Sequence, residues 1–507
     1  MISDSALLLR RFLRFNNRMN PSWTIENFLE VKNDQLHIHD VSAIDLANQF
    51  DTPLFVFSES RIRHNIERLK RAEREIGCPL KICYAAKANS NMAILRAVKD
   101  AGSDLEVNSG GELFKALEIG FRPEQIIFNG TSKTEKELEE AIDAGIYAIQ
   151  ADSFYEIELI ERVARRLNKR ANVSLRLVPE IETDTLHGLQ TALLTSKFGM
   201  MPQEALTAFR RWKPDDEFLN LCGIHLHIGS QNPTAQPYAE AFKTLFENLL
   251  LIFNETAHRL SHLNLGGGFP VNYLRDASNA ANFSIEQRSF FAAELEPGEV
   301  LAEAWKIVKG TAKEAAAEHL LENIELLIEP GRSVIADAGI CLTTVRNRKE
   351  RPVHISDLQN DSENFFDVST HNSQSAIQND TWLLTDAGFN ILLSMETYKW
   401  YYHLISAERA GENHQTKYKL AGPLCDGGDV YFDIEGANRL PDYRLLPEDV
   451  RPNEILALLN CGAYSIAQMS QYNGRGFPAI VLIKASGAVE LIRKRDGYED
   501  LLTNDVW

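Results

Sequence analysis

The sequence predicts an α/β protein in which a (β/α)8 barrel of the TIM type is joined to a second, mainly antiparallel β domain. The chain has 507 residues and a mass of 57.2 kDa, which exceeds what one hydrophobic core normally organises. Between about residues 80 and 330, short apolar or β-branched segments alternate with longer helical patterns, as in βαβ units. From Trp382 onwards the pattern changes to short apolar runs separated by turn residues, which indicates antiparallel strands.

Eight short segments of the first region are the predicted barrel strands. They are 81–85, 103–107, 126–128, 147–150, 173–177, 223–228, 262–265 and 325–328. Helical patterns separate them, for example at 91–100, 111–119 and 135–144. Barrels of this kind carry their active sites at the carboxyl-terminal ends of the strands, so residues that follow these segments are the first candidates for chemistry.

The second domain is predicted from residues on both sides of the barrel. Strand patterns occur at 420–424, 430–432, 454–459 and 479–484, and the segment 36–57 resembles them more than it resembles the barrel. We therefore expect a barrel at 58–334 and a β-rich domain formed by 31–57 together with 335–507. Segments 276–298 and about 350–380 are expected to be surface insertions.

The first 30 residues are predicted to form a helical extension. Arg10 and Arg11 interrupt a short apolar run, and no small-residue cleavage site follows, so an amphipathic surface helix is expected rather than a signal peptide. No segment approaches the roughly 18 consecutive apolar residues that a membrane span needs. We expect a cytoplasmic protein without a membrane partner.

Composition and charge narrow the classes of function. Hydrophobic residues make up 44% of the chain and charged residues 24%, which is typical of a globular protein. The formal net charge of -18 argues against a nucleic-acid partner, because such binding depends on Lys and Arg neutralising phosphates. The six cysteines lie far apart, without the density of a disulfide framework or the paired spacing of a zinc site. A small-molecule substrate is therefore expected.

Lys87 follows the first predicted strand in the segment Tyr84-Ala-Ala-Lys87. Partial burial there is expected to lower the pKa of the ammonium and to leave the neutral amine that Schiff-base formation needs. A solvated lysine at the end of a strand is the alternative interpretation.

A glycine loop and a turn at the end of the last strand indicate a cofactor that carries a phosphate. Gly267 and Gly268 belong to a run of three glycines after a strand, which allows the backbone to approach an anion closely. In the turn that begins at Glu329, Arg332 suits a phosphate oxygen and Glu329 suits a pyridine nitrogen. A flexible turn and a surface ion pair are the respective alternatives.

Two histidines and a thiol complete the candidates. His225 and His227 alternate along a predicted strand, but no third ligand lies near them in sequence. No metal is therefore predicted, and one histidine is expected to stack on an aromatic cofactor, with Ser230 contacting its phosphate. Cys425 beside Asp426 is expected to contact the substrate, although most free cysteines are small hydrophobic core residues.

Taken together, these motifs resemble the fold-type III pyridoxal-phosphate enzymes, and within them the diaminopimelate and ornithine decarboxylase group. The resemblance extends from Pro53 to Tyr472. It rests on YAAKAN, SGGEL, SKFG, HLHIGSQ, LGGGFP, EPGRS, DAGFN, GPLCDGGD and GAY, in that order. It implies an alanine-racemase-like barrel, pyridoxal 5'-phosphate as cofactor, carboxy-lyase activity, and a homodimer with shared active sites.

The resemblance also assigns roles to individual residues. Lys87 forms the internal Schiff base, His227 stacks on the pyridine ring and Glu329 pairs with the ring nitrogen. Cys425 and Asp426 enter the site of the partner subunit, where Cys425 returns a proton after carbon dioxide leaves. The other cofactor contacts implied are Glu106, Ser230, Gly267, Gly268, Arg332 and Tyr464; Glu106 stands where most relatives have an aspartate.

Departures from the family pattern bear on the substrate. Ser394-Met395-Glu396-Thr397-Tyr398 stands where diaminopimelate decarboxylases carry Arg-Pro-Ala-Leu-Tyr, whose arginine binds the distal carboxylate. The loss of that arginine and the gain of an acid disfavour a distal carboxylate. Asp426 stands where those enzymes have a glutamate, and it resembles the ornithine decarboxylase residue that contacts a distal ammonium.

We therefore predict decarboxylation of a basic diamino acid, ornithine or lysine, with the D-enantiomer as a further candidate. Glu396, Tyr398, Cys425 and Asp426 are the predicted substrate contacts. Four alternatives stay open: a diaminopimelate decarboxylase that makes L-lysine, a decarboxylase of a siderophore or antibiotic precursor, an amino-acid racemase, and a non-catalytic regulator.

Overall fold

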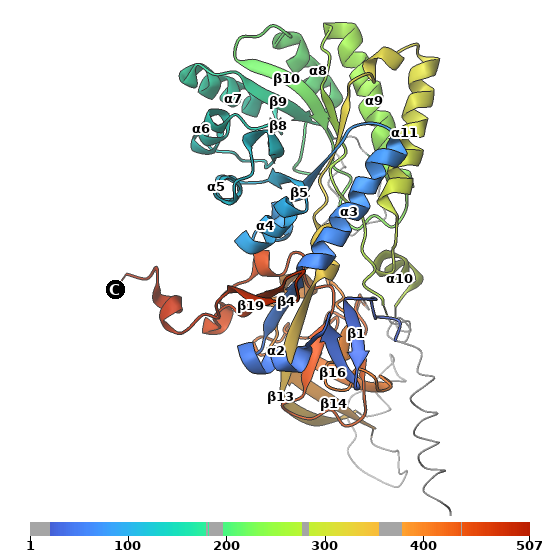
Figure 1. Cartoon of the computed structure of the whole chain (residues 1–507), viewed down its shortest axis with the longest axis vertical. Coiled ribbons are helices and arrows are strands. Elements are labelled where there is room, and N and C mark those ends of the chain that lie inside the picture. The colour runs from blue at the N-terminus through green and yellow to red at the C-terminus, as the bar shows by residue number, and fades with distance from the viewer. Residues whose placement is uncertain are drawn as a thin grey trace, which may run out of the picture.

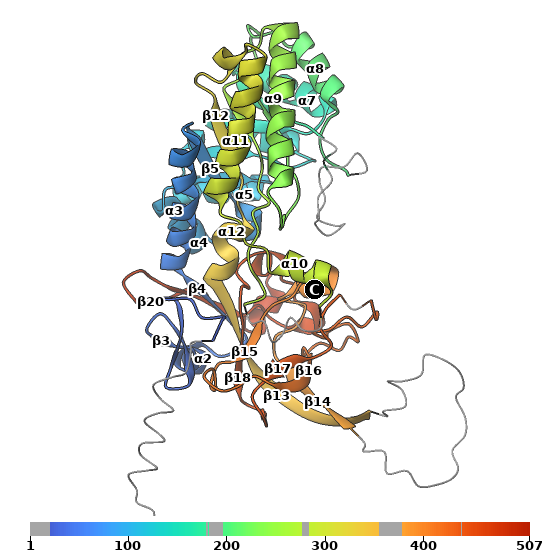
Figure 2. The ribbon, with the colours of Figure 1, turned by 90° about the vertical axis from the view of Figure 1, so that its right-hand side faces the viewer.

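The computed structural model describes residues 21–178, 181, 196–275, 283–353, 378–437 and 439–506. Figures 1 and 2 show a barrel with its surrounding helices at one end of the molecule and a β domain at the other. The predicted N-terminal amphipathic helix falls on residues 1–20, outside the described ranges. Residues 21–30 are described and form turns that lead into a strand, so the helical extension is wrong for this part.

Eight parallel strands close into the barrel, which confirms the predicted fold class. Its strands follow one another around the barrel in chain order, and the last pairs with the first. They are β5 (Leu80–Ala85), β6 (Asp104–Val107), β7 (Ile126–Phe128), β8 (Ala148–Ala151), β9 (Ala171–Arg176), β10 (Leu219–His225), β11 (His262–Asn264) and β12 (Glu325–Ile328).

Helices between the strands cover the outside of the barrel (Figures 1 and 2). Side chains at Ser58, Asn91, Ser109 and Thr134 accept backbone hydrogen bonds and begin four of them, as N-cap residues do. The helices are α3 (Glu59–Ile76), α4 (Met92–Asp100), α5 (Gly110–Ile119), α6 (Glu135–Ala144), α7 (Phe154–Leu167), α8 (Pro202–Arg211), α9 (Gln236–Thr256) and α11 (Pro297–Glu314).

The β domain is built from chain segments before and after the barrel. β4 (Leu54–Ser58) lies between β13 (Gly339–Val353) and β19 (Ala479–Ile483), antiparallel to the first and parallel to the second. The remaining strands of this sheet are β14 (Gln378–Thr385), β15 (Leu404–Ser406), β16 (Thr416–Ala421), β17 (Arg444–Leu446), β18 (Ile455–Leu458) and β20 (Val489–Arg493).

Smaller elements complete the described chain. A three-stranded sheet of β1 (Leu29–Lys32), β2 (Gln35–Ile38) and β3 (Val41–Ser42) precedes α2 (Ala43–Phe50). Short α-helices are α10 (Ile285–Phe291), α12 (Arg332–Ile335) and α13 (Leu393–Thr397). Short 3-10 helices lie at Ala86–Ala88, Pro123–Gln125, Glu318–Leu320, Ala336–Ala338, Ile466–Gln468, Tyr472–Gly474 and Glu499–Leu502. Within the described ranges, no helix combines the length and apolar character that crossing a bilayer requires.

The described part of the predicted insertion 276–298 is exposed around Ile285 but buries three phenylalanines. Phe283, Phe290 and Phe291 are at most 7% exposed. Phe291 packs edge-on against Trp400 and near Tyr401, which belong to the β domain. Its aromatic residues therefore join the barrel loops to the β domain. Most of the other predicted insertion, residues 354–377, lies outside the described ranges.

Two hydrogen bonds, one between backbone groups and one from a side chain, connect the β domain to the carboxyl end of the first barrel strand. The backbone N–H of Tyr464 donates to the carbonyl of Ala88 at 2.9 Å. The Asn89 side chain donates to the carbonyl of Gly462 at 3.5 Å. The segment of residues 461–464 therefore meets the loop that carries Lys87.

Candidate active site

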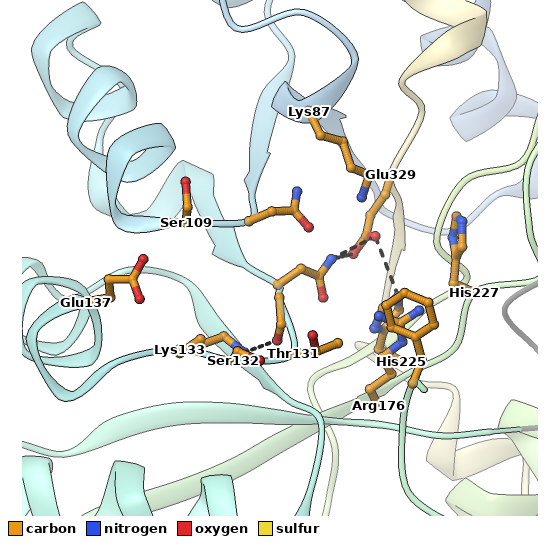
Figure 3. Close-up of a pocket in the computed structure, with 14 residues that line it drawn as sticks. Lys87, Ser109, Thr131, Ser132, Lys133, Glu137, Arg176, His225, His227 and Glu329 are labelled. Carbon is orange, nitrogen blue, oxygen red and sulfur yellow. Dashed lines mark hydrogen bonds and ion pairs between the residues drawn. The ribbon is translucent and has the colours of Figure 1, made fainter. Parts of the chain in front are cut away.

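A cavity of about 460 Å³ opens at the carboxyl ends of the barrel strands. Side chains from different strand ends line it and point into the same space (Figure 3), among them Lys87, Arg176, His225, His227 and Glu329. The structure therefore brings together in one cavity residues that are up to 242 positions apart, from Lys87 to Glu329.

Lys87 faces a buried acid across the cavity. Its Nζ lies 3.1 and 3.3 Å from the two carboxylate oxygens of Glu106, which is fully buried, while 39% of the Lys87 side chain is exposed. Desolvation alone would lower the pKa of Lys87, but the Glu106 carboxylate outweighs it and raises that pKa above its ordinary value. The expectation of a lowered pKa is therefore wrong, because the sequence did not show that Glu106 would lie so close.

Glu329 is a buried carboxyl held by amides. The Asn129 amide donates to both of its oxygens at 2.9 Å, and the Asn264 amide donates to one at 2.7 Å. No lysine or arginine of the described residues forms an ion pair with it; His225 Nε2 lies 3.6 Å away. Burial, reinforced by the nearby charge of Glu106, raises the pKa of Glu329 to about 7. Such a carboxyl suits a positively charged ring nitrogen.

Both histidines of the strand motif line the cavity and are neutral. Burial lowers the pKa of His225 and of His227 well below the ordinary range. His225 is the last residue of β10, whereas His227 lies in the loop that follows, so the two do not share a strand as predicted. The Nδ1 of His227 accepts a hydrogen bond from the backbone N–H of Gly267 at 3.1 Å, which fixes the ring beside the glycine loop.

Arg332 is buried at the start of α12, 8% exposed, and its guanidinium is surrounded by aromatic rings. Its Nε donates to the hydroxyl of Ser230 at 3.2 Å, and one terminal nitrogen donates to the hydroxyl of Tyr273 at 3.0 Å. The guanidinium carbon lies 4.0 Å from the ring centre of Trp400 and 4.9 Å from that of Tyr464. Arg332 and Glu329 therefore do not form the surface ion pair that was the alternative.

The glycine loop passes so close to its neighbours that side chains do not fit. A Cβ on Gly267 would lie 2.4 Å from the carbonyl oxygen of Glu329. At Gly268 the backbone φ is +103°, and a Cβ would lie 2.5 Å from the side-chain nitrogen of Asn232. These contacts explain the glycines, and they let the loop backbone pass directly beside Glu329 and Asn232.

These residues fit pyridoxal phosphate. An amine and a buried carboxyl without a paired lysine or arginine among the described residues line the cavity. The glycine loop contacts two cavity residues, His227 and Glu329, and the Arg332 guanidinium beside Ser230 supplies donors that suit a phosphate. The buried side-chain oxygen of Asn129 and both ring nitrogens of His225 make no hydrogen bond within the described part of the chain. Unsatisfied polar atoms at a cavity wall are the expected mark of a ligand that completes the site.

The predicted substrate contacts do not line this cavity within one chain. Cys425 and Asp426 are exposed, on a loop where the Tyr472 hydroxyl donates to Asp426 at 3.1 Å. Glu396 is partly exposed in α13, and the half-buried Tyr398 follows that helix. None of the four appears among the residues around the cavity of Lys87.

Several residues of the site were missed by sequence reasoning. Arg176 ends β9, lines the cavity and lies over the ring of Phe198 at 4.2 Å; its place at the end of a strand could have identified it. Tyr273 and Trp400 reach Arg332 only through tertiary packing, for which the sequence carries no local signal. Sequence reasoning also missed Lys399. Its Nζ donates to a carboxylate oxygen of Glu396 at 2.8 Å.

Comparisons with known proteins find pyridoxal-dependent decarboxylases, in family, sequence and structure alike. The family model for the pyridoxal-binding domain of pyridoxal-dependent decarboxylases matches residues 62–336. Diaminopimelate decarboxylase of Methanocaldococcus jannaschii is 32% identical over 94% of this chain and 96% of its own length. That of Aquifex aeolicus is 31% identical over 93% and 96%. The crystal structure of the M. jannaschii enzyme in complex with L-lysine aligns with a TM-score of 0.77 at 30% identity, over 96% of this chain and 99% of the other.

Proposed function

The chain belongs to the family of pyridoxal-dependent decarboxylases, and from this premise we propose that it removes a carboxyl group from meso-diaminopimelate to give L-lysine. At the coarser level it is a pyridoxal-phosphate-dependent carboxy-lyase of the ornithine, lysine and diaminopimelate decarboxylase group. Similarity to diaminopimelate decarboxylases over nearly the full length supports the choice of substrate.

One observation in the chain carries this choice. Glu396 replaces a neutral family residue and was expected to repel a distal carboxylate, but its charge is balanced by Lys399 at 2.8 Å. The Lys399 side chain is 5% exposed and that of Glu396 is 36% exposed, so the pair is held partly out of water. Of the two grounds against a substrate with a distal carboxylate, the added negative charge is therefore removed, and the missing arginine remains.

Each residue of the cavity has a separate task in this proposal. Bound pyridoxal phosphate supplies an electron sink for the pair of electrons released when the carboxyl group leaves. Lys87 binds the cofactor through its amine, and Glu106 stabilises the ammonium when that amine is free. Glu329 stabilises a proton on the ring nitrogen, while Arg332 and Ser230 bind the phosphate. His227 contacts one face of the ring.

Cys425 is the proposed proton donor. It lies outside the cavity of its own chain, so we propose that it reaches the cavity of a second subunit, together with Asp426. Its Sγ then delivers a proton to the carbon from which carbon dioxide has left, and Asp426 contacts the far end of the substrate.

Ornithine or lysine is the second candidate substrate. Ser394 lies where the arginine for a distal carboxylate is expected, and its hydroxyl donates to the side chain of Gln468 at 3.3 Å. Asp426 on the exposed loop suits a terminal ammonium. These two residues favour a substrate whose far end carries an amine alone.

Product analysis tests the proposal. The purified protein, loaded with pyridoxal phosphate, is incubated with meso-diaminopimelate, and the amino acids formed are separated and identified by mass. We expect L-lysine to accumulate, and we expect none with Lys87→Ala, which keeps the fold but lacks the amine. Diamines formed from ornithine or lysine, with diaminopimelate untouched, would establish the second candidate instead.

A further inference from the structure

A second cavity, of about 680 Å³, lies in the β domain. Parts of β13 and β14 line it, together with residues 422–424, 474–476 and 495–496. Among the described residues, those around this cavity include none of those around Lys87. Its volume is in the range of small-molecule binding sites, so its charges and unpaired polar atoms indicate what it could bind.

The acids at the wall of this cavity are already paired. Asp386 accepts hydrogen bonds from the Arg346 guanidinium at 2.8 Å and from the Thr343 hydroxyl at 2.7 Å. Asp496 forms an ion pair with Arg493 at 2.6 Å. Arginines of the protein itself therefore balance both negative charges.

Two further arginines line the cavity without an acid of their own. Within the described part of the chain, the Arg475 guanidinium donates only to the carbonyl of Pro423, at 2.9 Å. That of Arg495 donates to the carbonyls of Phe50 and Pro53 at 3.2 and 2.8 Å, and its buried Nε makes no hydrogen bond with the described residues. The wall therefore carries positive charge that no described carboxylate offsets, which suits an anion.

Asn390 adds a hydrogen-bond acceptor to the same wall. The residue is 4% exposed, and its side-chain oxygen is buried without a donor in the described ranges. A buried acceptor without a partner is costly, and an N–H group of a ligand would satisfy it. The cavity thus combines cationic donors with an acceptor that needs a donor.

The cavity borders the loop that carries Cys425. Pro423 and Leu424, which directly precede Cys425, line it. The backbone N–H of Cys425 donates to the side chain of Asn473 at 2.7 Å, and Arg475 from the same turn donates to Pro423. A ligand that draws the Arg475 guanidinium away from Pro423 would therefore loosen the loop at Cys425.

We propose that this cavity binds a small molecule that carries both a carboxylate and an N–H donor, as free and acylated amino acids do, and that the bound molecule slows decarboxylation through the Cys425 loop. Arg475 and Arg495 contact its carboxylate, and the Asn390 side-chain oxygen accepts its N–H. The binding part of this inference is independent of the proposed function, whereas the regulatory part rests on it.

Three probes of similar shape separate the contacts. N-acetylglycine carries both groups and lacks the free amine that would form a Schiff base with the cofactor. Levulinate replaces its N–H by a methylene group, and N-acetylglycinamide replaces its carboxylate by a neutral amide. Binding to the full-length, cofactor-loaded protein is titrated by ligand-observed NMR. We expect N-acetylglycine to bind roughly 5- to 30-fold more tightly than levulinate, and N-acetylglycinamide to bind more weakly than either.

Two variants place the binding in this cavity. Arg475→Met should weaken binding of N-acetylglycine roughly 10- to 100-fold, because it removes hydrogen bonds between charged groups. Arg162→Met, at a residue 59% exposed on α7 of the barrel, is the matched control and should bind as the wild type does. Asn390→Ala should remove the advantage of N-acetylglycine over levulinate. If this variant does not fold, Arg475→Met decides alone. Equal binding by the wild type and Arg475→Met, or no binding at all, would overturn the site.

The rate of carbon dioxide release tests the regulatory part. With saturating meso-diaminopimelate, N-acetylglycine should lower kcat of the wild type and of Arg162→Met, and should leave that of Arg475→Met at its own unliganded value. Binding with an unchanged wild-type kcat would overturn the regulatory role and leave the binding site in place. If the wild type releases no carbon dioxide from diaminopimelate, the proposed function fails, while the NMR titrations still decide whether the site exists.

Discussion

At the scale of residues, the site contains an acid and an amine whose pKa values the surrounding protein raises. Glu329 is 4% exposed and is surrounded by amides rather than by lysine or arginine. Lys87 instead pairs with Glu106. Burial therefore keeps the pKa of Glu329 high, and the Glu106 carboxylate keeps that of Lys87 high, so the site combines an acid that holds its proton with an amine that holds its own.

The raised pKa of Glu329 predicts a pH-dependent loss of stability. Its pKa is about 7 in the folded chain against an ordinary value of 4.5, so between these values the folded state binds the proton more tightly than the unfolded state. The free energy of unfolding contributed by this group therefore falls as pH rises from about 4.5 to 7 and is constant above. Glu329→Gln removes the contribution. Denaturant unfolding of the cofactor-free proteins between pH 5 and 8 checks this: the wild type should lose more stability with rising pH than the variant, and parallel curves would contradict it.

Trp400 is predicted to hold Arg332, the arginine proposed to bind the phosphate. Trp400→Leu removes the ring 4.0 Å from the Arg332 guanidinium, which should weaken binding of pyridoxal phosphate roughly 2- to 30-fold, the range of cation–π interactions. Titration of the cofactor-free protein with pyridoxal phosphate, followed by absorbance, measures the change. Trp382→Leu, in β14 of the β domain, is the matched control. Equal cofactor affinity in the two variants would mean that the ring has no such role.

The positions of Lys87, His227 and Glu329 at the cavity, and of Arg332 shortly after Glu329, could be predicted from the sequence, because each follows a strand of a recognisable barrel. Their partners could not. The contact of Glu106 with Lys87 depends on the register of two neighbouring strands. The neutralisation of Glu396 by Lys399 depends on a tight turn after α13, so the sequence suggested a free negative charge that the fold does not leave free.

At the scale of elements, the glycine loop after β11 positions the proposed phosphate site. Gly268→Ala should destabilise the protein by about 1–3 kcal/mol, the cost of a strained backbone, and should also weaken cofactor binding. The reasons are the φ of +103° and the contact with Asn232. Thermal unfolding with and without pyridoxal phosphate checks both effects.

Gly310→Ala provides the control for that substitution. Gly310 lies within α11, and a Cβ there meets nothing within 4 Å, so alanine should be neutral or stabilising. If Gly268→Ala behaves like Gly310→Ala, the loop is not constrained in the way described.

The strands of the barrel were predictable to within a few residues, because each is short, apolar and followed by a turn. The prediction of a surface insertion failed at segment 276–298, where polar and aromatic residues alternate without a clear period. Segment 276–298 contains phenylalanines that pack on Trp400 and Tyr401, but its composition resembled a surface loop. Only the tertiary fold shows that an element so far along the chain joins the two domains.

At the scale of the whole molecule, the two halves of the proposed site do not meet within one chain. The cavity of Lys87 lies at the barrel mouth, and Cys425 is exposed on the β domain. We therefore expect a dimer in which each site takes Lys87 from one subunit and Cys425 from the other.

Mixing two inactive variants tests the shared site. Lys87→Ala and Cys425→Ala are each expected to be inactive or nearly so, yet subunits exchanged between them form hybrids with one intact site. Equal amounts should recover about a quarter of the wild-type activity, since half of the dimers are hybrids and each has one of two sites. Activity that stays at the level of the separate variants, with exchange confirmed by mass, would place both residues in one subunit's site.

The most direct test of the account is the ratio of kcat/KM for carbon dioxide release from meso-diaminopimelate to that from ornithine and lysine, measured with the cofactor-loaded enzyme. The account predicts that diaminopimelate is preferred over both. A wild-type enzyme that releases carbon dioxide from ornithine or lysine and none from diaminopimelate would contradict it.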